Sequence, residues 1–158
     1  MRRLIAALVL AAVAALTAGL GPAFARSDAP LDTTTCAVTG TVTFSPPITN
    51  VIQTTVTDVY DQVTLTNCTG SVASAHIKGS LTGTGSCKKG ATKGTLTFKW
   101  NTGTRSRVRI RFKNGSLTGT VKTGTFAGGA VTGAVVLAPV GNCTTGVTSA
   151  GVKGTVTL

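Results

Sequence analysis

The chain has 158 residues and a formal charge of +11 at pH 7, and aspartate supplies all four of its acidic residues. A length of this order allows one domain with its own hydrophobic core. The absence of glutamate and the presence of a single histidine argue against a catalytic carboxylate pair and a histidine-rich metal site.

The first 25 residues predict a secretory signal peptide rather than part of the fold. A short basic start precedes an apolar stretch at 4–20, and a small-x-small cleavage site stands at 23–25. An uncleaved N-terminal anchor is the alternative interpretation. Cleavage before Arg26 would leave 13 cations against four acids, a formal charge of +9. Residues 26–35 predict a flexible leader, and no later apolar run reaches the roughly 18 residues that a membrane helix needs.

The cysteines predict two disulfides, because an even number in an exported chain favours complete pairing. The four residues are Cys36, Cys68, Cys87 and Cys143, which are too scattered for a zinc site. Residues 67–82 and 142–157 are identical at nine of 16 aligned positions. We therefore predict a single domain over 36–158, built from two related halves, 36–86 and 87–158. Each half would hold its own disulfide, which gives Cys36–Cys68 and Cys87–Cys143.

Strand-forming residues alternate with Gly, Asn and Pro throughout the remaining chain, and no window has helical spacing of apolar residues. We expect strands at 37–44, 51–57, 62–67, 72–82, 93–100, 104–113, 116–125, 130–138 and 147–157. Ser45-Pro46-Pro47 should end the first strand, and Asp58 and Asp61 should lie in a turn around Tyr60. The predicted fold is a single antiparallel β-sandwich or β-barrel of eight or nine strands. A barrel could enclose a small-ligand cavity.

A strict alternation of cations with mostly apolar residues runs from Arg105 to Lys113, and no acid follows Asp61. One face of this strand carries every cation, since side chains alternate faces with a period of two. The Asn114-Gly115 turn and a three-residue loop at 101–103 set the register of the neighbouring strands. The expected pairs are Phe112–Leu117, Arg111–Thr118, Arg109–Thr120, Val108–Val121, Leu96–Val108, Thr97–Arg107 and Lys99–Arg105.

This register predicts a face of cations and hydroxyls that could bind an anionic polymer. Its candidate anion-binding residues are Arg105, Arg107, Arg109, Arg111, Lys113, Lys99 and Lys122. Arginine binds phosphate or carboxylate through paired hydrogen bonds. Nucleic acid is disfavoured because the aromatic residues fall on the inward face, whereas base stacking needs exposed rings. The alternative is an ordinary solvated face, or an edge strand protected from aggregation by its charges.

The Ala-rich leader, the two Asn-Cys-Thr motifs and the Gly-Thr-Val-Thr strands resemble small secreted β-rich proteins of high-GC Gram-positive bacteria, a group that implies no particular activity. We expect a non-catalytic protein without cofactor or metal, secreted and retained at the cell wall by an anionic wall polymer or another polyanion. Two alternatives remain open. One is an inhibitor or toxin-like protein that contacts a protein partner through 88–92 or 139–146, and the other is a barrel that carries a small ligand.

Overall fold

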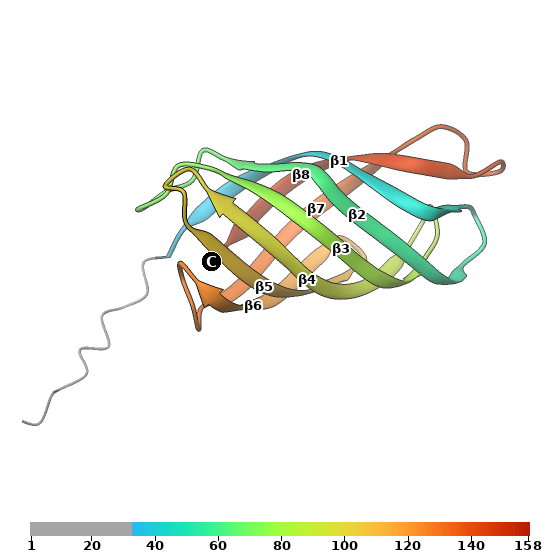
Figure 1. Cartoon of the computed structure of the whole chain (residues 1–158). Helices are drawn as coiled ribbons and strands as arrows, with labels where there is room; N and C mark the ends of the chain where they lie inside the picture. The colour runs from blue at the N-terminus through green and yellow to red at the C-terminus, as the bar shows by residue number, and fades with distance from the viewer. Residues whose placement is uncertain (1–32) are drawn as a thin grey trace, which may run out of the picture.

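Residues 33–158 form a closed barrel of eight antiparallel strands in the computed structural model (Figure 1). The strands are β1 (Thr35–Ile48), β2 (Gln53–Thr66), β3 (Ala75–Gly85), β4 (Gly90–Trp100), β5 (Arg105–Lys113), β6 (Ser116–Gly124), β7 (Ala130–Val140) and β8 (Val147–Thr157). Each strand pairs with the next, and β8 pairs with β1 to close the sheet. The predicted signal peptide and the leader up to residue 32 lie outside the described residues. Within 33–158, no helix is long and apolar enough to cross a membrane.

The predicted number of eight or nine strands is confirmed at eight, because the segments expected as separate strands at 51–57 and 62–67 form one continuous strand, β2. The turn expected around Tyr60 does not exist. Val56, Asp58 and Tyr60 are all buried, so the inward alternation continues through the aspartate. An irregularity in the pairing of β2 with β3 lies between Val59 and Val63, where the strand bends without ending.

Two expected boundaries of β1 also differ from the structure. The strand continues past Ser45-Pro46-Pro47 to Ile48, and Ser45 still pairs with Thr57 of β2, whereas the pairing with β8 is irregular between Thr43 and Ile48. Prolines, which lack an N–H, are tolerated where the ladder is interrupted. At its start, Thr34 exchanges backbone hydrogen bonds of 3.0 and 2.8 Å with Leu158. The end of the predicted flexible leader is therefore paired.

Both predicted disulfides are confirmed, and they lie at opposite ends of the barrel. Cys36–Cys68 is at the end formed by the loops 67–74, 101–104 and 125–129, which we call the plugged end. Cys87–Cys143 is at the end formed by the turns 49–52, 86–89, 114–115 and 141–146, which we call the open end. The two repeat copies lead into β3 and β8, which run in opposite directions because successive strands alternate.

Aromatic side chains fill the plugged end. Trp100 is 2% exposed, and its ring meets Phe98 and Phe126 edge to face at centroid distances of 5.9 and 5.4 Å. Its Nε1–H donates a hydrogen bond of 2.8 Å to the buried Ser106 Oγ, which satisfies the one polar atom of the indole. Asn101 Oδ1 accepts hydrogen bonds from the backbone N–H groups of Ala73 and Ser74, which ties two loops together over this end.

Glycines stand at inward positions where neighbouring strands approach closely. A Cβ on Gly154 would lie 2.1 Å from the carbonyl oxygen of Ala134, and one on Gly119 would lie 2.3 Å from that of Arg109. Contacts this short leave no room for any side chain, and both opposing atoms belong to the backbone, which cannot easily move. Glycine at these positions allows the strong curvature by which a sheet closes into a barrel.

We expect Gly154→Ala to lower the free energy of unfolding by roughly 1–3 kcal/mol or more, because the added methyl group meets backbone. Gly151→Ala on the same strand is the matched control. Its Cβ would make an ordinary contact of 3.9 Å with the Ala138 carbonyl oxygen. Urea denaturation of the oxidised protein measures both variants. Equal stability of the two would contradict the close approach at Gly154.

Candidate functional site: a basic face on strands β4 to β6

The structure confirms the predicted register around the arginine strand. All seven expected cross-strand pairs are present on the two sides of β5. Asn114 and Gly115 both have positive φ angles, 48° and 86°, as a two-residue hairpin turn requires. The inward residues Val108, Ile110 and Phe112 are buried, so the cations between them point to the outer surface.

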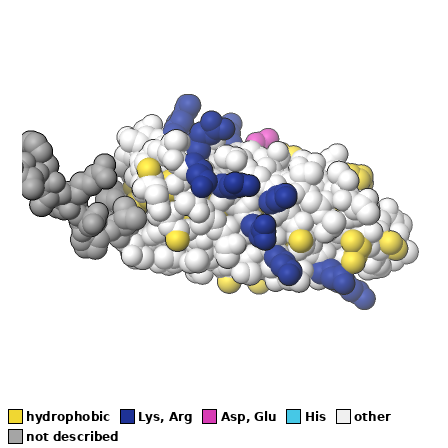
Figure 2. All heavy atoms as spheres, turned by 90° about the horizontal axis from the view of Figure 1, so that it is seen from below, with side chains coloured by type: hydrophobic (Ala, Val, Ile, Leu, Met, Phe, Trp, Pro, Cys, Tyr) yellow, Lys and Arg dark blue, Asp and Glu magenta, His cyan; other side chains and the backbone are white. Residues whose placement is uncertain are grey.

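The row of cations is exposed along the whole of β5. Every second residue from Arg105 to Lys113 is exposed, and every residue between them is buried. Strands β4, β5 and β6 contain no aspartate. Figure 2 shows lysine and arginine side chains as a diagonal band on one side of the barrel, with little acidic surface beside it. We call this surface the basic face.

Like charges lie directly opposite one another on the basic face. Lys99 pairs with Arg105, and Lys93 pairs with Arg111. Like charges at directly opposed positions destabilise a sheet. Lys93 was missed in the sequence analysis, although extension of the Thr95–Arg109 register by two residues would have found it. The face is therefore more strongly basic than the sequence analysis predicted.

The basic face is hollowed between β4, β5 and β6. A depression of about 370 Å³ is lined by Lys93, Arg109, Ile110, Arg111, Thr118, Gly119 and Thr120. A second depression of about 400 Å³ shares Lys93 and Arg111 with it and extends to Lys113. Three cations and two hydroxyl groups thus surround one concave surface. Guanidinium, ammonium and hydroxyl groups together donate the hydrogen bonds that phosphate and carboxylate oxygens accept.

Lys122 lies at a β-bulge and not at a regular position of the face. A bulge lies between Arg107, which pairs with Thr123, and Val108, which pairs with Val121. Lys122 is the extra residue of this bulge, so it is exposed without a direct cross-strand partner. Bulges are not visible in a pattern of alternating residues, which is why the sequence analysis included Lys122 in the face without one.

A second unusual group is the carboxyl of Asp58, which lies inside the barrel at 4% exposure. Thr92 Oγ1 donates a hydrogen bond of 2.7 Å to Asp58 Oδ2. Burial raises the pKa of Asp58 to about 6, and the Thr92 hydrogen bond only partly opposes this effect. Burial and the nearby Asp58 charge also raise the pKa of Tyr60.

The remaining candidate residues of the sequence analysis do not form a second site. His76 is exposed on β3 opposite Lys99. Among residues 33–158, no group of three or more His, Cys, Asp or Glu side chains is placed to hold a metal ion.

The chain matches no protein-family model, and no curated protein or solved structure is detectably similar to it.

The buried carboxyl should make stability fall as the pH rises from about 4 to about 7. The unfolded chain releases the proton near the ordinary pKa of 3.8, whereas the folded protein keeps it to about pH 6. Folding therefore binds a proton in this interval, and ionisation of the buried group above it costs up to about 3 kcal/mol. We expect Asp58→Asn to flatten this part of the pH profile in urea denaturation. Asp61→Asn, an exposed position on the same strand, should leave it unchanged.

Proposed function

We propose that this chain is a non-catalytic, exported protein that binds an anionic polymer through the basic face. The observation that carries the proposal is the exposed row of cations from Arg105 to Lys113, of which Arg109 and Arg111 line a concave surface together with Lys93. A continuous strip of one charge sign concentrates oppositely charged ligands near it and accelerates their association.

Solvation alone does not account for arginine on this face. Other parts of the outer wall are solvated with small residues, as on β1, where Thr39 and Thr43 are exposed, and on β7, where Thr132 and Ala134 are exposed. A wet outer surface on this barrel therefore does not require charge. The opposed like charges on β4 and β5 carry a cost in stability that threonine would avoid. A ligand that neutralises these charges would remove the cost.

Protection of a sheet edge does not account for the row either. Charged residues often prevent edge strands from pairing with other chains. Strand β5 is hydrogen-bonded to β4 on one side and to β6 on the other, and the sheet has no free edge because the barrel is closed. This alternative interpretation therefore does not apply to the strand that carries the arginines.

The spacing of the cations suits a linear polyanion with phosphate groups. Alternate residues of a strand are about 6.6–6.8 Å apart, so the four arginines extend over roughly 20 Å. Phe98, Trp100 and Phe112 are buried, and no aromatic residue lies at an exposed position of the basic face. Base stacking has no ring available there, which favours a polyol-phosphate wall polymer over single-stranded nucleic acid. The two disulfides are consistent with export, which would bring the basic face to such a polymer outside the cell.

Binding to a linear poly(glycerol phosphate) tests the proposal. The affinity should fall steeply with salt, because each neutralised phosphate releases a counterion. Arg107→Ser plus Arg109→Ser should weaken binding about 10-fold or more at low salt and reduce the slope of log K against log salt by roughly 1–2. Isothermal titration at several salt concentrations measures both quantities.

The control variant removes the same charge elsewhere. Lys88→Ser plus Lys153→Ser takes two exposed cations from the turn between β3 and β4 and from β8, outside the basic face. Its loss of affinity should be much smaller than that of the arginine pair. Equal effects of the two double variants would show that net charge, and not this face, determines binding.

Exposed apolar residues support a second candidate function, recognition of a protein partner. Val51 and Ile52 on the turn between β1 and β2 are 73% and 48% exposed, and Val140 at the end of β7 is 62% exposed. The predicted contact segments 88–92 and 139–146 partly belong to strands, and the connections themselves are 86–89 and 141–146. Exposed apolar groups of this kind occur at protein-binding surfaces.

A protein partner of this kind should remain bound at about 1 M salt, where charge interactions are screened. Val51→Ser plus Ile52→Ser should release it, because the variant removes the apolar contact without changing charge. Analytical size exclusion of the captured complex measures its stoichiometry. Retention by the serine variant would exclude this turn as the contact.

A further inference from the structure

The open end of the barrel contains a pocket that is separate from the basic face. Its volume is about 280 Å³. Its apolar walls include Phe44, Ile48, Val56, Phe112, Val135 and Leu137, and its polar lining includes Asp58 and Thr92. The contrast with the plugged end is clear, since no tryptophan fills this end. Inward positions near the mouth are instead held by Gly85 and Gly90, which contribute no side chain.

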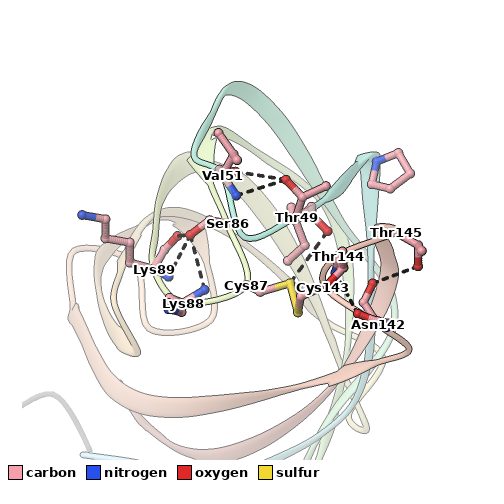
Figure 3. The surroundings of a disulfide bond; sticks show 12 residues. Thr49, Val51, Ser86, Cys87, Lys88, Lys89, Asn142, Cys143, Thr144 and Thr145 are labelled. Carbon is pink, nitrogen blue, oxygen red and sulfur yellow. Dashed lines mark hydrogen bonds between the residues drawn. A yellow bond between two sulfur atoms is a disulfide. The ribbon is translucent and has the colours of Figure 1, made fainter.

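The rim of the pocket is fixed by covalent and hydrogen bonds (Figure 3). The Cys87–Cys143 disulfide joins the turn between β3 and β4 to the loop between β7 and β8. The Cys87 N–H donates to the Thr49 carbonyl at 2.8 Å, which adds the turn between β1 and β2. On the far side, the Asn114 N–H donates to the Gly90 carbonyl at 2.9 Å. Four turns are thus held together, so the mouth is formed before any ligand arrives.

Asp58 is the one acidic group among the residues that line this pocket, and the two cations of the lining, Lys88 and Lys89, are exposed at its rim. Its cross-strand neighbours on β1 and β3 are Phe44 and Leu81, and Thr92 on β4 donates its hydrogen bond. The remaining titratable groups nearby are Tyr60 on the same inward face and the exposed Lys88 and Lys89 at the rim. Neither lysine lowers the pKa of Asp58, which burial raises to about 6.

A buried carboxylate without a cationic partner is costly to keep. Asparagine or threonine in the same place would accept the Thr92 hydrogen bond without a charge. A chain with so few acids nevertheless has one of them in the pocket wall. A ligand that brings a positive charge to Asp58 would offset the cost, because an opposite charge within a few ångströms favours the ionised form.

We infer that the pocket binds a small apolar molecule carrying one ammonium group, with the ammonium against Asp58 and the apolar body between the walls. A cavity of about 150 Å³ is known to hold benzene, so roughly twice that volume suits a molecule of about ten non-hydrogen atoms. The exposed Lys88 and Lys89 repel a second positive group at the rim, which limits the ligand to a single charge. Acidic groups on the ligand are disfavoured at the buried end by Asp58 itself.

The test uses three probes of matched shape and different charge: 2-phenylethylammonium, 2-phenylethanol and 3-phenylpropanoate. NMR titration of the oxidised protein at pH 7.5 should show the ammonium binding about 10-fold or more tightly than the alcohol, because a charged hydrogen bond is added. The methyl signals of Val56, Val135 and Leu137 at the open end should shift, and those of Val121 and Val131 should not. Tighter binding of the alcohol or the carboxylate, or shifts at the plugged end, would overturn the proposal.

Two variants locate the charge that is responsible. Asp58→Asn should lose about 10-fold or more in affinity for 2-phenylethylammonium and keep its affinity for 2-phenylethanol, whereas Asp61→Asn should match the parent for both. At pH 5, where Asp58 takes up its proton, the parent should lose its preference for the ammonium. Should Asp58→Asn fail to fold, the loss of preference at pH 5 decides the question in the unmodified chain. An unchanged preference at pH 5 would overturn the role of Asp58. Arg107→Ser plus Arg109→Ser should not affect the titration, which keeps this test independent of polymer binding.

Discussion

Closure of the sheet by β1 and β8 is the constraint on which the other features depend. The two strands pair from Thr35–Thr157 to Thr43–Ser149, so every strand of the barrel has two hydrogen-bonded neighbours. A closed sheet separates an inside from an outside along each strand. The period-of-two alternation on β5 can then bury Val108, Ile110 and Phe112 while its cations remain in water. Closure also removes the free edges that would otherwise explain a charged strand.

The two ends of the barrel interior are filled differently. Side chains pack the plugged end, whereas the open end keeps a pocket. The plugged end holds the indole of Trp100 with its partner Ser106, and this end contributes dense aromatic packing. The open end has glycine, threonine and aspartate at inward positions, and this composition leaves a pocket. One barrel interior thus contains a packed end and a pocket. The Cys87–Cys143 disulfide crosslinks two connections at the open end, next to this pocket.

Much of the fold was predictable, for reasons that lie in particular residues. Asn114-Gly115 fixed one hairpin, and the alternation from Arg105 fixed the faces, so the register of β4 to β6 followed. The repeat around Cys68 and Cys143 predicted the pairing of the cysteines, although β3 and β8 run in opposite directions. Asp58 misled because aspartate is typical of turns. A cavity was among the expected alternatives for a barrel, but its position and lining could not be predicted, since inward glycines such as Gly85 look like turn residues until the strands are placed.

The direction of β5 relative to the barrel also determines how the protein would lie on an extended surface. Strands of an eight-stranded barrel are tilted by roughly 35–45° from its axis. The exposed arginines of β5 follow that tilt, and Figure 2 shows an oblique band of lysine and arginine side chains on one side of the barrel. A polymer strand in contact with them would cross the barrel obliquely and leave it lying on its side. Both ends would then face along the surface, and solutes could enter the mouth while the protein stays attached.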